Sequence, residues 1–158
     1  MLSRATGLKR GLLRTRVGLV TQSKRTIISE DHYIHRPTDG EEISFSIFVS
    51  DDPWGEWDIT RSIICMPDWH GPTDEMKAMA QAVADKTNWR VFLPNIYGKG
   101  KSAANIKEAR QMFEELDYTR TIEDMGWIAK KLRSWQPGSG IGTIGFSVGG
   151  AMALEACA

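Results

Sequence analysis

Residues 141–158, which read IGTIGFSVGGAMALEACA, decide the fold of this chain. Ile141 to Gly145 are typical of a buried strand, and the small residues from Val148 onward are typical of a helix. Between them lies G-x-S-x-G, a sharp strand-to-helix turn that exposes Ser147 at the end of a sheet. We expect glycine at 145 and 149 because a side chain there would collide with the neighbouring strand or helix.

The turn predicts acyl-transfer chemistry at Ser147. The first amides of the following helix have no helical partner, so they can donate hydrogen bonds to an oxyanion that forms beside the serine. A serine hydroxyl is a weak nucleophile, and it needs an adjacent base that is itself oriented by a carboxylate. The sequence ends eleven residues after Ser147, and we expect the acid and the base in a continuation of the chain.

Charge divides the sequence into two parts. Residues 1–29 hold seven Lys and Arg and no acidic residue, whereas the rest holds 13 basic and 20 acidic residues, a net charge of −7. The basic, hydroxyl-rich segment is typical of an organellar transit peptide, mitochondrial or, alternatively, plastid. The other interpretation of this segment is a disordered basic tail, or a tail that contacts anionic lipid. The acidic body argues against nucleic acid as a partner.

The composition indicates one ordinary globular domain. No apolar run approaches the roughly 20 residues of a membrane span. Two cysteines give no disulfide framework, and we expect Cys65 and Cys157 to be small, reduced core residues. Together with three histidines, they offer no metal-ligand spacing, and no cofactor is indicated.

Hydrophobic periodicity gives the order of elements. Two strands joined by a Pro-Thr-Asp-Gly turn come first, and the first of them is expected at the sheet edge. Buried strands then alternate with helices, which predicts an α/β sheet with right-handed crossovers. Trp54 and Trp57, in an acidic loop, are expected to cover a sheet edge or line an interface. The predicted strands span 31–35, 43–49, 62–66, 90–93 and 141–146, and the predicted helices span 73–87, 104–116, 119–134 and the stretch from about 148.

Three motifs together resemble the dienelactone hydrolase family of the α/β-hydrolase superfamily. They are IICMPDWHG at 63–71, WRVFLPNIYG at 89–98 and GFSVGG at 145–150. The likeness covers about residues 32–158, the N-terminal half to two-thirds of such a domain. It implies a mostly parallel sheet with helices on both faces, cut off after the nucleophile elbow. The expected organisation is therefore a leader over 1–29 and a partial hydrolase domain over 30–158.

The resemblance also implies roles for individual residues. Ser147 would be the nucleophile, in a place where the family typically has cysteine, and the backbone amides of Trp69 and Val148 would form the oxyanion hole. Asp68, His70 and Tyr97 would lie near the pocket. Asp68 stands where the family often has glutamate, and Asn95 replaces a common acidic residue.

Other polar residues near these motifs have simpler interpretations. His70 could serve as a replacement base, but its loop position suits a backbone donor better. His32 and His35 are expected to be structural or solvent-facing. The Gly98–Lys101 stretch lacks the spacing of a phosphate-binding loop, and we expect a surface loop near the pocket mouth.

Two hypotheses for function follow from the sequence. The first is a serine hydrolase acting on a small ester or lactone through an acyl-serine, present here as an incomplete chain. The second is a non-catalytic imported subunit that uses the truncated fold as an interaction module. In that case a protein partner would cover the open sheet edge beside the 141–146 strand.

Overall fold

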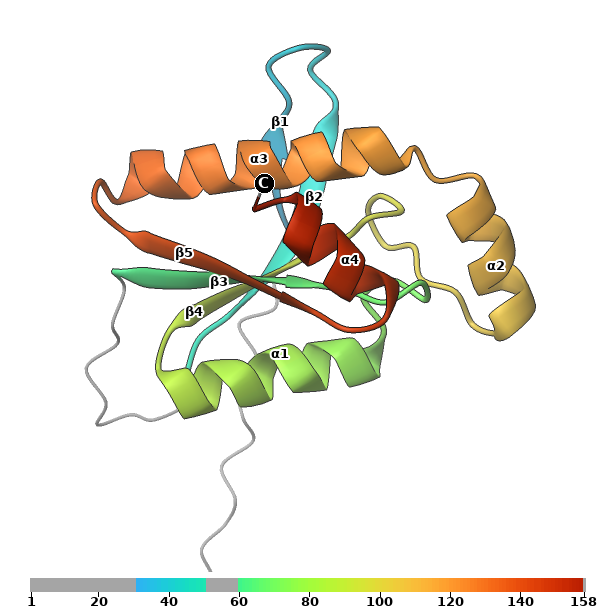
Figure 1. Cartoon of the computed structure of the whole chain (residues 1–158), viewed down its shortest axis with the longest axis horizontal. Coiled ribbons are helices and arrows are strands. Elements are labelled where there is room, and N and C mark those ends of the chain that lie inside the picture. Colours follow the sequence, from blue (N-terminus) through green and yellow to red (C-terminus); the bar gives the residue numbers. More distant parts are fainter. Residues whose placement is uncertain (1–30, 51–59, 158) are drawn as a thin grey trace, which may run out of the picture.

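The computed structural model describes residues 31–50 and 60–157, and it contains an open five-stranded sheet with four helices (Figure 1). The predicted leader and the loop with Trp54 and Trp57 lie outside the described residues. No helix of the described residues is long and apolar enough to cross a membrane. The strands are β1 Asp31–His35, β2 Glu42–Phe48, β3 Arg61–Met66, β4 Arg90–Pro94 and β5 Gly140–Gly145. The helices are α1 Asp74–Thr87, α2 Ile106–Glu114, α3 Tyr118–Trp135 and α4 Val148–Glu155.

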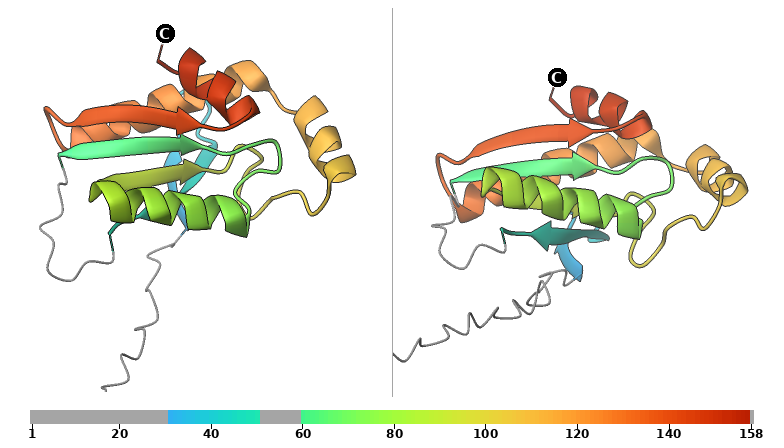
Figure 2. Two further views of the ribbon diagram at one scale, coloured as in Figure 1. Left: turned by 60° about the horizontal axis from the view of Figure 1, so that its bottom comes forward. Right: turned by 90° about the horizontal axis from the view of Figure 1, so that it is seen from below.

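The sheet is mixed, in the order β1-β2-β4-β3-β5. Both pairings of β3 are parallel, whereas β2 is antiparallel to β1 and to β4. The prediction of a mostly parallel sheet was therefore only partly right. The difference arises because the hairpin places β2 beside β4, where it runs against the parallel strands. As expected, β1 forms an edge, and it lies at the opposite end of the sheet from β5 (Figure 2).

Helices cover both faces of the sheet, as predicted. On one face α1 packs its Met76, Ala80 and Ala84 against the buried side chains of Phe48 and Leu93. On the other face α3 and α4 cover a cluster that includes Ile64, Met66, Phe92, Met125, Ile128, Leu132 and Met152. Because both faces are covered, even the serines of β2 are buried, which its alternating pattern alone did not indicate.

An ion-pair network fastens the β1–β2 hairpin to α3. Arg36, which is only 5% exposed, donates from Nε and Nη2 to both carboxylate oxygens of Asp124 at 2.7 and 2.8 Å. It also donates to Asp39 at 2.7 Å, and Arg120 of α3 donates to Asp39 and Glu41. The hydrogen bond to Asp124 holds the pKa of Arg36 above its ordinary value. The hairpin is thus tied to the helix by charge-assisted hydrogen bonds as well as by packing.

The two cysteines have different environments. Cys65 is completely buried in β3, as expected, and burial raises its pKa to about 11. The prediction that Cys157 is a core residue was wrong, because this residue is exposed and lies two positions beyond Glu155, the last residue of α4. Its Sγ lies 3.1 Å from Oγ1 of Thr143. The small-residue pattern of α4 continues past the end of the helix, so it did not reveal this exposure.

Candidate active site

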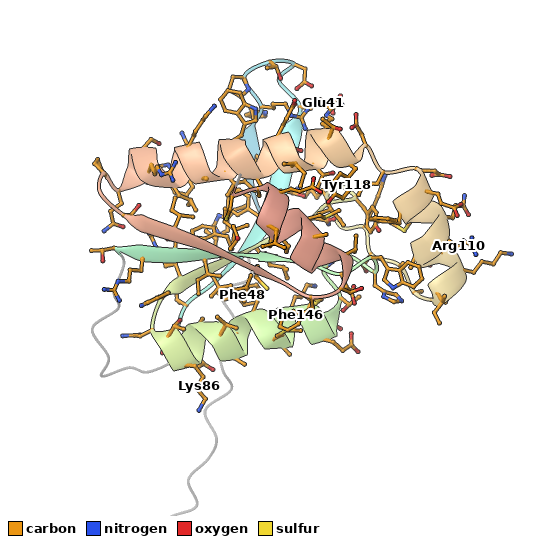
Figure 3. The ribbon with its side chains drawn as sticks, in the orientation of Figure 1. Glu41, Phe48, Lys86, Arg110, Tyr118 and Phe146 are labelled. Carbon is orange, nitrogen blue, oxygen red and sulfur yellow. The ribbon has the colours of Figure 1, made fainter. Side chains whose placement is uncertain are left out.

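Ser147 stands at the strand-to-helix turn that the sequence predicted. It follows β5 with φ 55° and ψ −126°, and α4 begins at the next residue. This backbone conformation is costly for a residue with a side chain, by roughly 1–3 kcal/mol, and such strain gathers at functional sites. Ser147 is exposed, and its hydroxyl makes no capping bond to α4. The side chain is therefore presented to solvent beside Phe146, which is itself 50% exposed (Figure 3).

Two glycines allow the close packing that the turn requires. A Cβ on Gly145 would overlap the carbonyl of Gly149, and a Cβ on Gly149 would overlap the carbonyl oxygen of Pro67. The same Cβ on Gly149 would stand 2.7 Å from the carbonyl oxygen of Met66. The first turn of α4 thus rests directly on the end of β3. Because Met66 pairs with Gly145 in parallel register, the serine turn and the loop after β3 lie side by side.

The loop after β3 carries the second expected oxyanion donor. Asp68 accepts a hydrogen bond from the amide of His70 at 2.8 Å, and the amide of Gly71 bonds to the Asp68 carbonyl at 3.0 Å. These bonds form a tight turn around Trp69. Among the described residues, the amides of Trp69 and Val148 donate no hydrogen bond. Two amides without a protein acceptor are what the expected oxyanion hole requires.

Tyr97 holds this loop in place, a role that the sequence did not reveal. Its hydroxyl donates to the carbonyl oxygen of Trp69 at 2.6 Å, and its ring lies against Gly71, where φ is +82°. Burial and then the negative charge of Asp68 raise the pKa of Tyr97 to about 12. The side chain of Asn95 accepts from the amide of Tyr97 at 3.1 Å and so shapes its approach. That Tyr97 lies near a substrate pocket stays a prediction, and its hydroxyl is bonded to the Trp69 carbonyl of the loop.

His70 belongs to the same loop, and its side chain contacts its neighbours in that loop. Its Nδ1 lies 3.6 Å from the Asp68 carboxylate, and its ring packs edge-on against Trp69 at 5.6 Å. Its carbonyl accepts from Ala103 at 2.8 Å, which ties down the loop that contains residues 98–101. That loop lies beside the candidate site, since the carbonyl oxygen of Lys101 is 3.6 Å from a Cβ built on Gly71.

The other predicted residues lie away from this cluster or offer no ligand set. His32 and His35 belong to β1, at the far edge of the sheet from β5, where His32 stacks on Phe45 at 6.1 Å and His35 bonds to Gly40 at 3.1 Å. Among the described residues, no three His, Cys, Asp or Glu side chains are grouped to hold a metal ion.

Comparisons with known proteins point to one family and one fold. The family model described as the dienelactone hydrolase family matches residues 53–158. A structure named m3DLH has a TM-score of 0.58 at 18% identity, covering 82% of this chain and 54% of that protein. A dienelactone hydrolase-like promiscuous phosphotriesterase, P91, from metagenomic libraries gives 0.55 at 19% identity, covering 82% and 54%. An α/β serine hydrolase homologue from Coxiella burnetii gives 0.56 at 21% identity, covering 80% and 56%.

These structural likenesses show the fold. The chain spans about half the length of the solved structures it matches, 54% of the first two. No curated protein sequence matches the chain significantly.

Proposed function

This chain belongs to the dienelactone hydrolase family, and we propose that it carries the nucleophile and the oxyanion hole of a serine hydrolase for a small ester or lactone. The observation that carries the proposal is the strained, exposed Ser147, held between Gly145 and Gly149 against the end of β3. A fold that needed Ser147 only for packing would have no reason to keep a side chain in this conformation.

The proposed reaction begins with attack of the Ser147 hydroxyl oxygen on the substrate carbonyl carbon. The hydroxyl proton passes to a histidine base, and the carbonyl oxygen becomes an oxyanion that accepts from the amides of Trp69 and Val148. The carbon–oxygen bond to the leaving alkoxide then breaks, and the alkoxide takes the proton from the base. Water repeats these steps on the acyl-serine, which releases the acid and restores Ser147.

We place the base and its orienting acid in the part of the family fold that follows the elbow, because acid and histidine follow the serine in α/β-hydrolases. His70 is the alternative base, because its Nδ1 lies 3.6 Å from the Asp68 carboxylate and its Nε2 could then accept a proton, and the His70→Ala variant described below distinguishes the two assignments. We propose that Tyr97 positions the oxyanion loop through its bond to the Trp69 carbonyl, while making no contact with substrate. Each well-placed oxyanion donor is typically worth about 3 kcal/mol in the transition state.

A fluorophosphonate probe, which modifies activated serines, tests the proposal on the whole protein as isolated from its source. We expect labelling of one serine, Ser147, with simultaneous loss of activity on aryl esters. Labelling and turnover should vanish in Ser147→Ala and persist in His70→Ala. Absence of labelling in the folded protein, or equal labelling of Ser147→Ala, would contradict the proposal. Activity lost in His70→Ala as well would assign the base to this loop.

A second candidate function is a non-catalytic one, in which a partner protein covers the sheet beside β5. It is favoured by Leu154, which is 77% exposed on α4, and by Phe146 at the preceding turn. Large exposed apolar side chains at a free strand edge are typical of interaction surfaces. This function predicts that the 158-residue chain aggregates alone and becomes soluble with its partner. A monomer at high concentration with a cooperative thermal transition would contradict it.

A further inference from the structure

A groove unrelated to the serine site runs between the edge strand β1 and helix α3. Its volume is about 520 Å3, and its walls come from Tyr33, Ile34 and Pro37 on one side and from Trp127 and Trp135 on the other. Two of its rings are unusually open to solvent, since Tyr33 is 52% exposed and Trp135 is 49% exposed. Exposed aromatic rings that line a concavity are a common feature of binding surfaces.

A lysine ammonium group lies over each of the three aromatic rings of the groove, those of Tyr33, Trp127 and Trp135. The ammonium of Lys130 lies 4.2 Å from the ring centroid of Trp127, and that of Lys131 lies 5.8 Å from the centroid of Trp135. The ammonium of Lys99 lies 6.0 Å from the centroid of Tyr33. Cation–π contacts of this kind hold the lysines close to the groove without neutralising them.

The charge of the groove is opposite to that of the body around it. Among the residues that the structure describes, its lining includes Lys130 and Lys131 and no Asp or Glu. By contrast, the sequence after residue 29 has 13 basic and 20 acidic residues. An acid-free groove with lysines on an acidic protein favours an anionic ligand.

The outer edge of β1 indicates that the ligand is an extended chain. β1 pairs only with β2, so its other edge has no strand beside it in the described sheet. The amide of Arg36 donates to the carbonyl of Glu41 at 2.8 Å. Because bonding alternates along an antiparallel pair, the backbone groups of Tyr33 and His35 point away from β2. The groove therefore lies beside backbone donors and acceptors that an extended chain can pair with.

We propose that this groove binds an extended, acidic segment of a partner protein, which adds to the sheet along β1. Its backbone would pair with Tyr33 and His35, its apolar side chains would enter between the strand and the indoles of Trp127 and Trp135, and its carboxylates would meet the lysines. A small anionic molecule would leave the strand edge unused. The chain's own residues 1–29 carry seven basic and no acidic residues, so their positive charge would repel the lysines of the groove.

Fluorescence anisotropy with the full chain tests this proposal. The probe is a fluorescein-labelled decapeptide of alternating glutamate and valine. We expect saturable binding that weakens with added salt and that becomes roughly tenfold weaker in the double variant Lys130→Glu and Lys131→Glu. A comparable loss is expected in Trp135→Ala, whose exposed ring can be removed without opening the core.

Matched controls separate the groove from general charge and hydrophobicity. Lys86→Glu changes an exposed lysine on α1, which covers the other face of the sheet (Figure 3), and Ile106→Ala removes a 68% exposed side chain from α2. Both should bind as the unmodified chain does. Two versions of the same peptide, N-methylated at the odd or at the even amides, should differ, and the version that loses the amides facing β1 should lose binding, because it cannot complete the strand ladder.

Three outcomes would overturn the proposal. The first is equal loss of binding in Lys86→Glu and in the double lysine variant. The second is undiminished binding of both alternate N-methylated peptides, which would indicate a ligand that does not use the strand edge. The third is tighter binding of a lysine–valine decapeptide, or of a synthetic peptide of residues 20–29, than of the glutamate–valine probe.

Discussion

The stability of the β1–β2 hairpin on α3 depends on the pair between Arg36 and Asp124, and we predict that Asp124→Ala lowers the free energy of unfolding by about 2–3 kcal/mol. Asp124 accepts two hydrogen bonds from Arg36, at 2.7 and 2.8 Å. A hydrogen bond to a charged group contributes roughly 1.5–3 kcal/mol, and leaving a buried charge unpaired is costly. We place the cost below the roughly 3–5 kcal/mol of a fully buried pair, because Arg36 keeps Asp39 and because the Asp124 side chain is 17% exposed, so that water can partly replace it.

Urea unfolding followed by far-ultraviolet circular dichroism measures this cost. A loss of this size lowers the unfolding midpoint by about 1 M or more for a small domain. Glu114→Ala is the matched control, because it breaks an Arg–carboxylate contact of 2.9 Å on α2 whose side chains are 74% and 65% exposed. That change should cost less than about 0.5 kcal/mol. Arg110, its partner, is labelled in Figure 3.

The reasoning would be refuted if Asp124→Ala cost no more than Glu114→Ala. Asp124→Asn should fall between the two, because the amide keeps one acceptor oxygen but loses the charge. The Arg36–Asp124 pair also holds the hairpin against α3 beside the groove. We therefore expect Asp124→Ala to lose peptide binding at temperatures where the chain stays folded.

Three further predictions concern single side chains. The ionisation of Tyr97, isolated at 295 nm by subtracting the titration of Tyr97→Phe, should show a pKa of about 12. Because folding favours the neutral phenol, the stabilisation that Tyr97 provides through its raised pKa is complete below pH 10 and declines as the pH rises from 10 to 12. At pH 8 a thiol reagent should modify exposed Cys157 rapidly, whereas Cys65, buried and with a pKa of about 11, should react only after unfolding; two fast thiols would contradict this. Ser147→Gly should be more stable than Ser147→Ala by about 1 kcal/mol in urea, because glycine relieves the positive φ; equal stabilities would refute the strain.

The sequence predicted the elements that local pattern controls. The strands around residues 62–66 and 90–93 lie within one or two residues of β3 and β4, because short apolar runs closed by proline leave little choice. The elbow was also predictable from local sequence, because a Cβ at Gly145 or Gly149 would overlap the backbone and only glycine fits there.

Contacts between distant residues were not predictable. Arg36 and Asp124 are 88 positions apart, and nothing near either one indicates its partner. The bond from Tyr97 to the Trp69 carbonyl, across 28 positions, depends on the side-by-side placement of β3 and β4. Likewise, local pattern gave the strands of the sheet but did not show that β2 would insert antiparallel beside β4.

If Ser147 attacks the substrate, an acyl group should become attached to that residue, and trapping this adduct would test the proposed reaction directly. The whole protein would be mixed with a p-nitrophenyl ester, quenched in acid within seconds and analysed by intact mass and peptide mapping. We expect one acyl group, located on the peptide that contains Ser147 and absent from Ser147→Ala. Rapid ester turnover with no adduct on that peptide, or an adduct that survives in Ser147→Ala, would contradict it.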